Sequence, residues 1–83
     1  MPTIVRESGF GIRIYTFDHP PPHVHVEKAG AVVKINLMGC QVIRIVGNIS
    51  DRDVKRAEQI VAKYAETLMK AWQELHGGKQ DHS

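Results

Sequence analysis

Apolar and polar residues alternate in short runs along the first half of the chain. Four such runs, GIRIYTF, HVHVE, AVVKINL and QVIRIV, are rich in β-branched residues and are separated by Gly or Pro. Strands that cover a core on one face show this two-residue period, and turn residues between them are typical of hairpins. A fifth run, PTIVRE, precedes them. The pattern therefore predicts an antiparallel meander of four or five strands over residues 2–47.

After residue 50 the apolar spacing changes to that of a helix. Ser50 is suited to cap a helix, and Gly77 and Gly78 are suited to end it. Between them, apolar residues recur every three or four positions: Val54, Ala57, Val61, Tyr64, Ala65, Leu68, Trp72 and Leu75. We predict a single two-layer α+β domain over residues 1–83, with one long C-terminal helix at 50–76 on one face of the sheet and a frayed tail at 77–83.

The apolar arc of the predicted helix is wider than one packing surface requires. Ile60, Met69 and Ala71 extend it to about half of the circumference, against roughly 100° for a helix that lies on one surface. Two interpretations stay open: these residues pack against a second copy of the chain, or they edge a shallow core. The first interpretation predicts a homo-oligomer.

Alternation along the strands assigns each side chain to a face of the sheet. Val24 and Val26 are placed beneath the helix, so His23, His25 and Glu27 lie on the opposite, open face. The same rule places Ile12, Ile14, Val33, Ile35, Leu37, Ile43 and Ile45 beneath the helix. It places Arg13, Tyr15, Lys34, Asn36 and Arg44 on the open face with the histidines.

The connections between strands predict which side chains of the open face are neighbours. A hairpin through residues 18–22 places Tyr15 opposite His25 and Arg13 opposite Glu27. The second of these pairs joins opposite charges.

The next hairpin turns at two residues, and it adds basic groups to the same face. It places Lys34 opposite His25 and Asn36 opposite His23, and pairing of the following strand places Arg44 opposite Lys34. Like charges that face each other are unfavourable unless an anion or a carboxylate lies between them. The open face therefore favours an anionic ligand.

Composition limits the classes of protein to which the chain can belong. Its one cysteine excludes an internal disulfide and a cysteine-based zinc cluster. No run reaches the ~18 apolar residues of a membrane span, and the first residues lack the pattern of a signal peptide. We therefore expect a cytoplasmic protein without a membrane partner. The net charge of +2 is too small to predict nucleic-acid binding from bulk charge, so such a prediction must rest on a local patch.

Residues 18–27 read DHPPPHVHVE and hold three of the five histidines and three of the four prolines of the chain. In a first interpretation, His19, His23 and His25 bind a divalent metal such as zinc, because alternate strand positions point to the same side. Asp18 or Glu27 would complete the ligand shell.

Two further interpretations require no cofactor. In one, His23, His25 and Tyr15 are catalytic groups for acid and base chemistry on RNA, with Lys34 or Arg44 binding phosphate. In the other, the histidines belong to an interface, where Arg13, Asp18, His19, Glu27, Lys34 and Arg44 bind a partner. The residues alone leave open whether the protein is an enzyme.

Several segments together resemble one family. An MPT start, a GxRIY strand, the motif DHxPPHVHVE and a helix that contains Ala71 and Trp72 are similar to the prokaryotic family filed as domain of unknown function 4160. The resemblance covers nearly the whole chain. In one departure, Tyr64 stands where relatives often carry histidine.

The resemblance implies a small cytosolic α+β protein, encoded next to another small protein with which it forms a toxin–antitoxin-type module. On this basis we expect the histidine-rich sheet face to bind the small protein partner, with RNA as a further ligand. The alternative expectation is a metal-binding enzyme or sensor that uses His19, His23 and His25.

Overall fold

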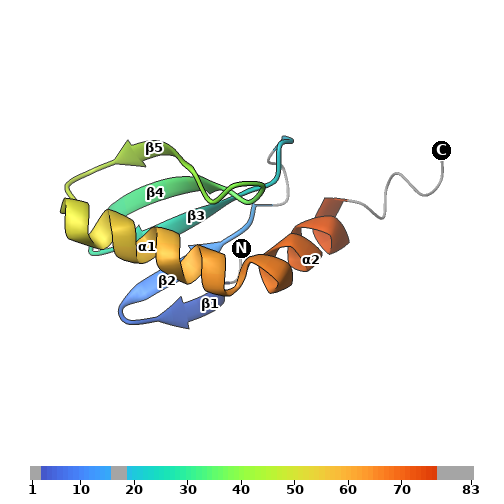
Figure 1. The fold of residues 1–83 in the computed structure, drawn as a ribbon, viewed down its shortest axis with the longest axis horizontal. Helices are drawn as coiled ribbons and strands as arrows, with labels where there is room; N and C mark the ends of the chain where they lie inside the picture. Colours follow the sequence, from blue (N-terminus) through green and yellow to red (C-terminus); the bar gives the residue numbers. More distant parts are fainter. Residues whose placement is uncertain (1–2, 16–18, 77–83) are drawn as a thin grey trace.

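Five antiparallel strands form one sheet in the computed structural model, which describes residues 3–15 and 19–76 (Figure 1). Each strand pairs with the next along the chain, in the order β1 (Thr3–Glu7), β2 (Phe10–Arg13), β3 (His23–Lys28), β4 (Ala31–Asn36) and β5 (Val42–Val46). The predicted meander is confirmed, with five strands. The tail that we predicted at 77–83 lies outside the described residues.

Two of the connections are two-residue turns. Ser8 and Gly9 join β1 to β2, and Ala29 and Gly30 join β3 to β4, with a positive φ at all four positions. Turns of this kind match the right-handed twist of antiparallel strands. They therefore fix the register of the strands that they join.

Two helices follow the sheet, so the prediction of one long helix is wrong. Helix α1 spans Asp51–Lys63 and helix α2 spans Ala65–His76. Ser50 caps α1 as predicted, because its hydroxyl oxygen accepts a hydrogen bond from the backbone N–H of Asp53 at 3.1 Å. Neither helix, within the part of the chain that the structure describes, is long and apolar enough to cross a membrane.

The break between the helices lies at Tyr64, whose backbone leaves the helical region at φ −107° and ψ 17°. Its hydroxyl group donates a hydrogen bond of 2.6 Å to Glu7 of β1, and Lys63 contacts the same carboxylate at 3.1 Å. The break therefore coincides with an attachment of the helical segment to the edge of the sheet. Beyond it α2 continues past the end of the sheet, and Leu68 and Trp72 close that end of the core (Figure 1).

The attachment at Glu7 affects the pKa of both charged partners. The hydrogen bond from Tyr64, followed by that from Lys63, lowers the pKa of Glu7 from its ordinary value of 4.5. The same contact with Glu7 raises the pKa of Lys63 from 10.5. The contact therefore stabilises the fold between these two values.

We expect the substitution Glu7→Gln to flatten the pH dependence of stability at both ends. In the wild type, stabilisation is present above pH 4.5 and is lost as the pH falls through the lowered pKa of Glu7. It is also present below pH 10.5 and is lost as the pH rises through the raised pKa of Lys63. Melting temperatures measured across the pH range test this, with Glu74→Gln, an exposed position of α2, as the control. Wild-type slopes retained by Glu7→Gln would contradict it.

The core lies between the sheet and the two helices. Val24, Val26, Val33 and Ile35 are at most 1% exposed, as alternation along the strands predicted. They pack against both helices, which contribute Ala57, Ile60, Val61, Leu68 and Trp72. Ile60 is therefore buried in the core of one chain and does not require a second copy for its burial.

Strand β5 is less well covered than predicted. Ile45 pairs with Val33 and shares its face, yet Ile43 and Ile45 are 47% and 45% exposed. For Ile43 the reason is a register shift, because Val42 pairs with Ile35 and packs against the core in its place. For Ile45 the reason is position: β5 is an edge strand, and α1 packs mainly against β4 (Figure 1). Val46, on the other face of β5, is also exposed.

Candidate functional site

Four basic residues stand directly opposite one another across the open face, which is the face of the sheet away from α1. Arg13 of β2 pairs with His25 of β3, His25 pairs with Lys34 of β4, and Lys34 pairs with Arg44 of β5. We call these four residues the basic row. Neighbouring strands are about 4.8 Å apart, so the row extends roughly 14 Å across the sheet.

The register confirms one part of the prediction and corrects another. Lys34 lies opposite His25 and Arg44 lies opposite Lys34, as predicted from the turn at residues 29–30. Arg13, however, lies opposite His25 and not opposite Glu27, so the predicted pairing of β2 with β3 is wrong by two residues. A shift of two residues leaves every side chain on its face. The composition of the open face is therefore unaffected.

The charges of the open face are incompletely paired. Arg13 Nε lies 3.5 Å from Glu27 Oε1, and the Tyr15 hydroxyl donates to Glu27 Oε2 at 3.5 Å. Within the described residues, the side chains of Arg6, Lys34 and Arg44 make no hydrogen bond or ion pair. The open face thus offers cationic groups that are available to an anion.

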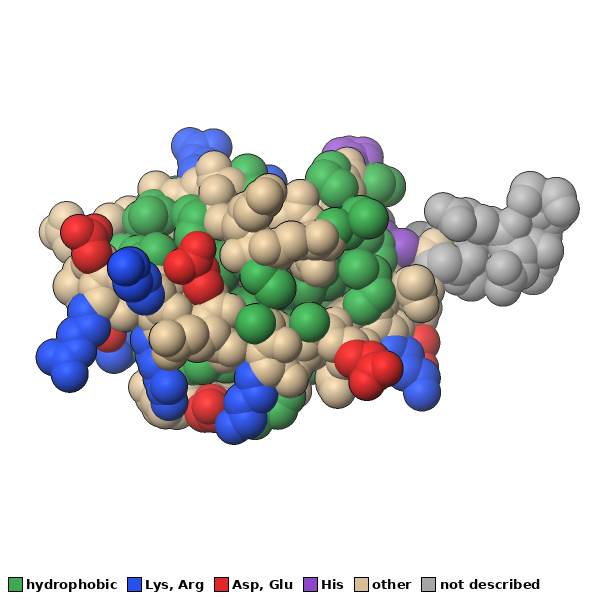
Figure 2. Space-filling model, viewed as in Figure 1, with side chains coloured by type: hydrophobic (Ala, Val, Ile, Leu, Met, Phe, Trp, Pro, Cys, Tyr) green, Lys and Arg blue, Asp and Glu red, His purple; other side chains and the backbone are tan. Residues whose placement is uncertain are grey.

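The helix side of the molecule differs from the open face. There, Lys28 pairs with Asp53 at 3.3 Å and Lys63 pairs with Glu7 at 3.1 Å. Acidic and basic side chains are interspersed on that side (Figure 2). Among the described residues, an excess of positive charge is therefore a property of the open face.

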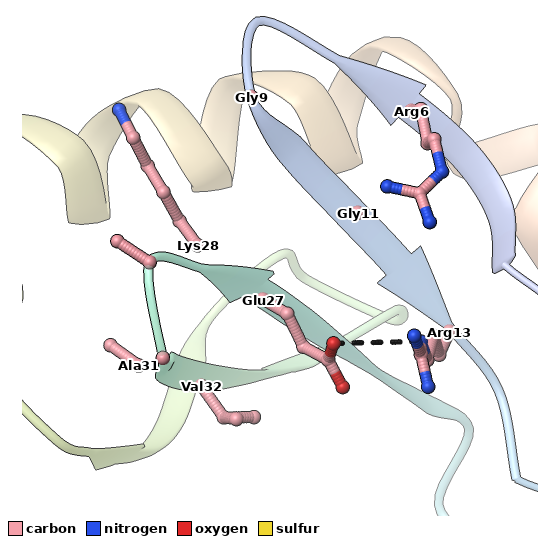
Figure 3. A pocket seen from close by; sticks show the side chains of 10 residues that line it. Arg6, Gly9, Gly11, Arg13, Glu27, Lys28, Ala31 and Val32 are labelled. Carbon is pink, nitrogen blue, oxygen red and sulfur yellow. Dashed lines mark ion pairs between the residues drawn. The ribbon is translucent and has the colours of Figure 1, made fainter.

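Two adjoining hollows lie along the open face. The smaller has a volume of about 200 Å³ and is lined by His25, Val32, Lys34, Arg44 and Val46. The larger has a volume of about 440 Å³. It is lined by the hairpin that joins β3 to β4 and by residues of β1 and β2 around Gly11, among them Arg6, Arg13, Glu27 and Val32 (Figure 3). Val32 lines both hollows, so they lie next to each other beside the basic row.

A chain of ring contacts leads from the open face to α2. The Tyr15 and His25 rings are 4.6 Å apart in an edge arrangement, and the His25 and His23 rings are 5.3 Å apart. His23 in turn lies 5.3 Å from Trp72, and the ring of Trp72 stacks on that of His76 at 3.8 Å. These aromatic contacts join the start of β3 to the second helix.

His23 is buried, so the prediction that both strand histidines are exposed on the open face is wrong for this residue. Only 4% of His23 is exposed, and its Nδ1 donates a hydrogen bond of 2.8 Å to the backbone carbonyl of Pro21. The reason is the break at Tyr64, which directs α2 so that Trp72 covers this end of the face. His25 keeps a partly exposed position beside Tyr15.

The remaining residues of the histidine motif are placed as follows. His19 is exposed in the loop before β3, where the peptide bond between Pro20 and Pro21 is cis. Asp18, predicted as a binding residue, lies outside the described residues. Over 3–15 and 19–76, no group of three or more His, Cys, Asp or Glu residues is arranged to hold a metal ion. The metal interpretation stays a prediction.

Sequence reasoning missed several residues of this face. Arg6 was not assigned, although the alternation of PTIVRE carries the signal, because Arg6 pairs with Gly11 and so shares the face of Glu27. Gly11 had no assigned role, yet it lines the larger hollow. The contacts of Trp72 and His76 had no signal in the sequence, because they depend on the direction of α2.

The comparisons with known proteins identify a family, and its description names no activity. A family model described as a domain of unknown function (DUF4160) matches residues 9–73 of the 83 residues. The match includes the histidine motif, the whole basic row and most of both helices. No curated protein and no solved structure matches the chain.

Proposed function

We propose that this chain, which belongs to the DUF4160 family, binds RNA through the open face of its sheet as a cytoplasmic component of a toxin–antitoxin-type module. The observation that carries the proposal is the basic row, in which Arg13, His25, Lys34 and Arg44 face one another across four strands.

An anionic polymer fits this row better than a single small anion does. Lys34 and Arg44 are direct neighbours without a carboxylate partner in the described part of the chain, and like charges at such positions repel. Phosphates along a backbone would neutralise successive members of the row, and the released counterions would favour binding.

The shape and the aromatic groups of the face favour a single strand of RNA. Sheet surfaces bind single-stranded RNA by combining basic groups with rings on which unpaired bases stack. Tyr15 and His25 are partly exposed and adjoin the basic row. Duplex RNA, by contrast, keeps its bases stacked inside the helix, so rings on a sheet surface would have no unpaired base to contact.

The burial of His23 supports binding over catalysis. Two imidazoles were predicted as catalytic groups, but His23 lies against Trp72 and uses Nδ1 to contact Pro21. A general acid or base must reach the reacting group of its substrate. His25 and Tyr15 retain access to the face, where they fit the role of base-contacting rings.

The salt dependence of RNA binding tests the proposal. We expect a mixed-sequence single-stranded RNA to bind with a slope of log affinity against log salt of about −2 to −3, since each neutralised phosphate contributes ~−0.7. Fluorescence anisotropy at 50 to 200 mM salt measures it. Lys34→Gln should reduce the slope by about 0.7, whereas Lys70→Gln, on exposed α2, should leave it unchanged. Absence of RNA binding at low salt would refute the proposal.

Binding of a protein partner is a second candidate function, which the edge strand β5 favours. Ile43, Ile45 and Val46 are 47%, 45% and 53% exposed, and the outer backbone of β5 is unpaired within the described residues. Such an edge can accept a strand from another protein. The small protein encoded nearby is the partner that we propose, and a second copy of the chain is the alternative. Capture of that protein without any RNA binding would favour this candidate over the first.

A further inference from the structure

The larger hollow of the open face combines groups that the binding of phosphates alone would not require. Arg6 and Arg13 are cationic, whereas Glu27, which faces them across the hollow, is anionic, and Val32 adds an apolar wall (Figure 3). A phosphate in the centre of the hollow would approach the Glu27 carboxylate and be repelled. A cationic ligand would be repelled by the two arginines.

Glu27 is a carboxylate with acceptor capacity to spare. Both of its described contacts, with Arg13 and with Tyr15, are 3.5 Å long. Charge-assisted hydrogen bonds are usually about 2.7–2.9 Å long, so these two contacts are weak. The side chain is 33% exposed and lines the hollow, so its oxygens are accessible to a donor from a ligand.

We infer that this hollow binds one unpaired guanine of the RNA, with Glu27 as the group that recognises the base. The inference rests on the proposed function. Guanine presents two neighbouring N–H donors on its Watson–Crick edge, which match the two oxygens of one carboxylate. Adenine and uracil lack this pair of donors, and cytosine offers one amino group.

The remaining groups of the hollow fit the rest of a nucleotide. Its volume of about 440 Å³ falls within the range of small-ligand sites. Arg6 has no described partner and lies across Gly11 from Glu27, where it can bind the phosphate of the same nucleotide (Figure 3). Arg13 belongs to both the hollow and the basic row, so it connects the guanine site with the row of cations that would bind the RNA backbone.

Four RNA oligomers test the inference. Each is a uridine-rich single strand that differs at one central position, which holds G, A, C or U. We expect the wild type to bind the G oligomer about tenfold more tightly than the A and U oligomers, since a matched bidentate contact contributes of this order. Tight but equal binding of all four would overturn the guanine site and leave the proposed function intact. No binding of any of them would refute the proposed function as well.

Substitution of Glu27 tests whether its carboxylate is the group that produces the preference for guanine. Glu27→Gln should reduce the preference for G to less than about threefold, because an amide carries one acceptor in place of two. Its affinity for the all-uridine oligomer should not fall, since a negative charge has been removed. The matched control Glu74→Gln, at an exposed position of α2, should retain the preference. A preference for G that survives in Glu27→Gln would overturn the role of this residue.

Discussion

Replacing Trp72 by alanine is expected to lower the free energy of unfolding by about 3–5 kcal/mol, as removal of a large buried aromatic side chain commonly does. Trp72 is 5% exposed, and it contacts His23 of the sheet as well as His76 of its own helix. Domains of this size are stable by roughly 5–15 kcal/mol, so the loss would leave a marginal fold. Urea denaturation followed by circular dichroism measures it.

The neighbouring residue of the same helix provides the control. Gln73 is exposed, and Gln73→Ala should change the free energy of unfolding by less than about 0.5 kcal/mol. A loss below about 1 kcal/mol in Trp72→Ala would contradict the role assigned to Trp72, because it would mean that α2 contributes little to the core. Trp72→Phe, which keeps a ring against His23, should fall between the two variants.

Because His23 is buried against Trp72, a substitution of His23 affects stability as well as function. Loss of function with an unchanged melting temperature would locate chemistry at an exposed histidine. At His23 the same substitution would remove a buried ring and its hydrogen bond to Pro21, so stability and function would change together. Of the two histidines of β3, His25 is the one at which function can be tested separately from folding.

Local sequence signals were sufficient for most of the sheet. Alternation placed the valines of β3 beneath α1, and the two-residue turn at Ala29 and Gly30 fixed the register of β3 with β4. The connection from β2 to β3 is much longer, and its length does not determine a register. The prediction there was wrong by two residues, an even number, and for that reason Arg13 still lies on the open face.

The features that sequence could not supply depend on contacts between distant segments. No glycine or proline near Tyr64 indicates the break in the sequence. The break coincides with a hydrogen bond to Glu7, 57 residues earlier in the chain. The burial of His23 follows from the direction that this break gives to α2. The relative positions of His25, Lys34 and Arg44 in the basic row were predicted correctly. The hollow at Gly11 could not be predicted, because it depends on how β1 pairs with β2, and no register had been assigned to β1.

Reversing one charge of the basic row should strongly weaken RNA binding while sparing the fold. In Arg44→Glu, the repulsion between Arg44 and Lys34 is replaced by a cross-strand pair of opposite charges. Such pairs contribute about 0.2–1 kcal/mol, so the free energy of unfolding should stay constant or rise by this amount. The same carboxylate would meet the RNA backbone on the open face. It would also withdraw Lys34 from the phosphates by pairing with it.

We expect the affinity of Arg44→Glu for single-stranded RNA to fall by about 30-fold or more at 100 mM salt, because two phosphate contacts are lost and a like charge is added. The matched control is Arg52→Glu, an exposed position in the first turn of α1 that changes the net charge by the same amount. It should bind RNA within about threefold of the wild type, since a distant surface charge is largely screened at this salt concentration. Equal losses in both variants would show that net charge, and not the basic row, determines binding. A lower stability of Arg44→Glu would show that Arg44 and Lys34 do not repel each other in the folded protein. The proposed function rests on that repulsion and would lose this support.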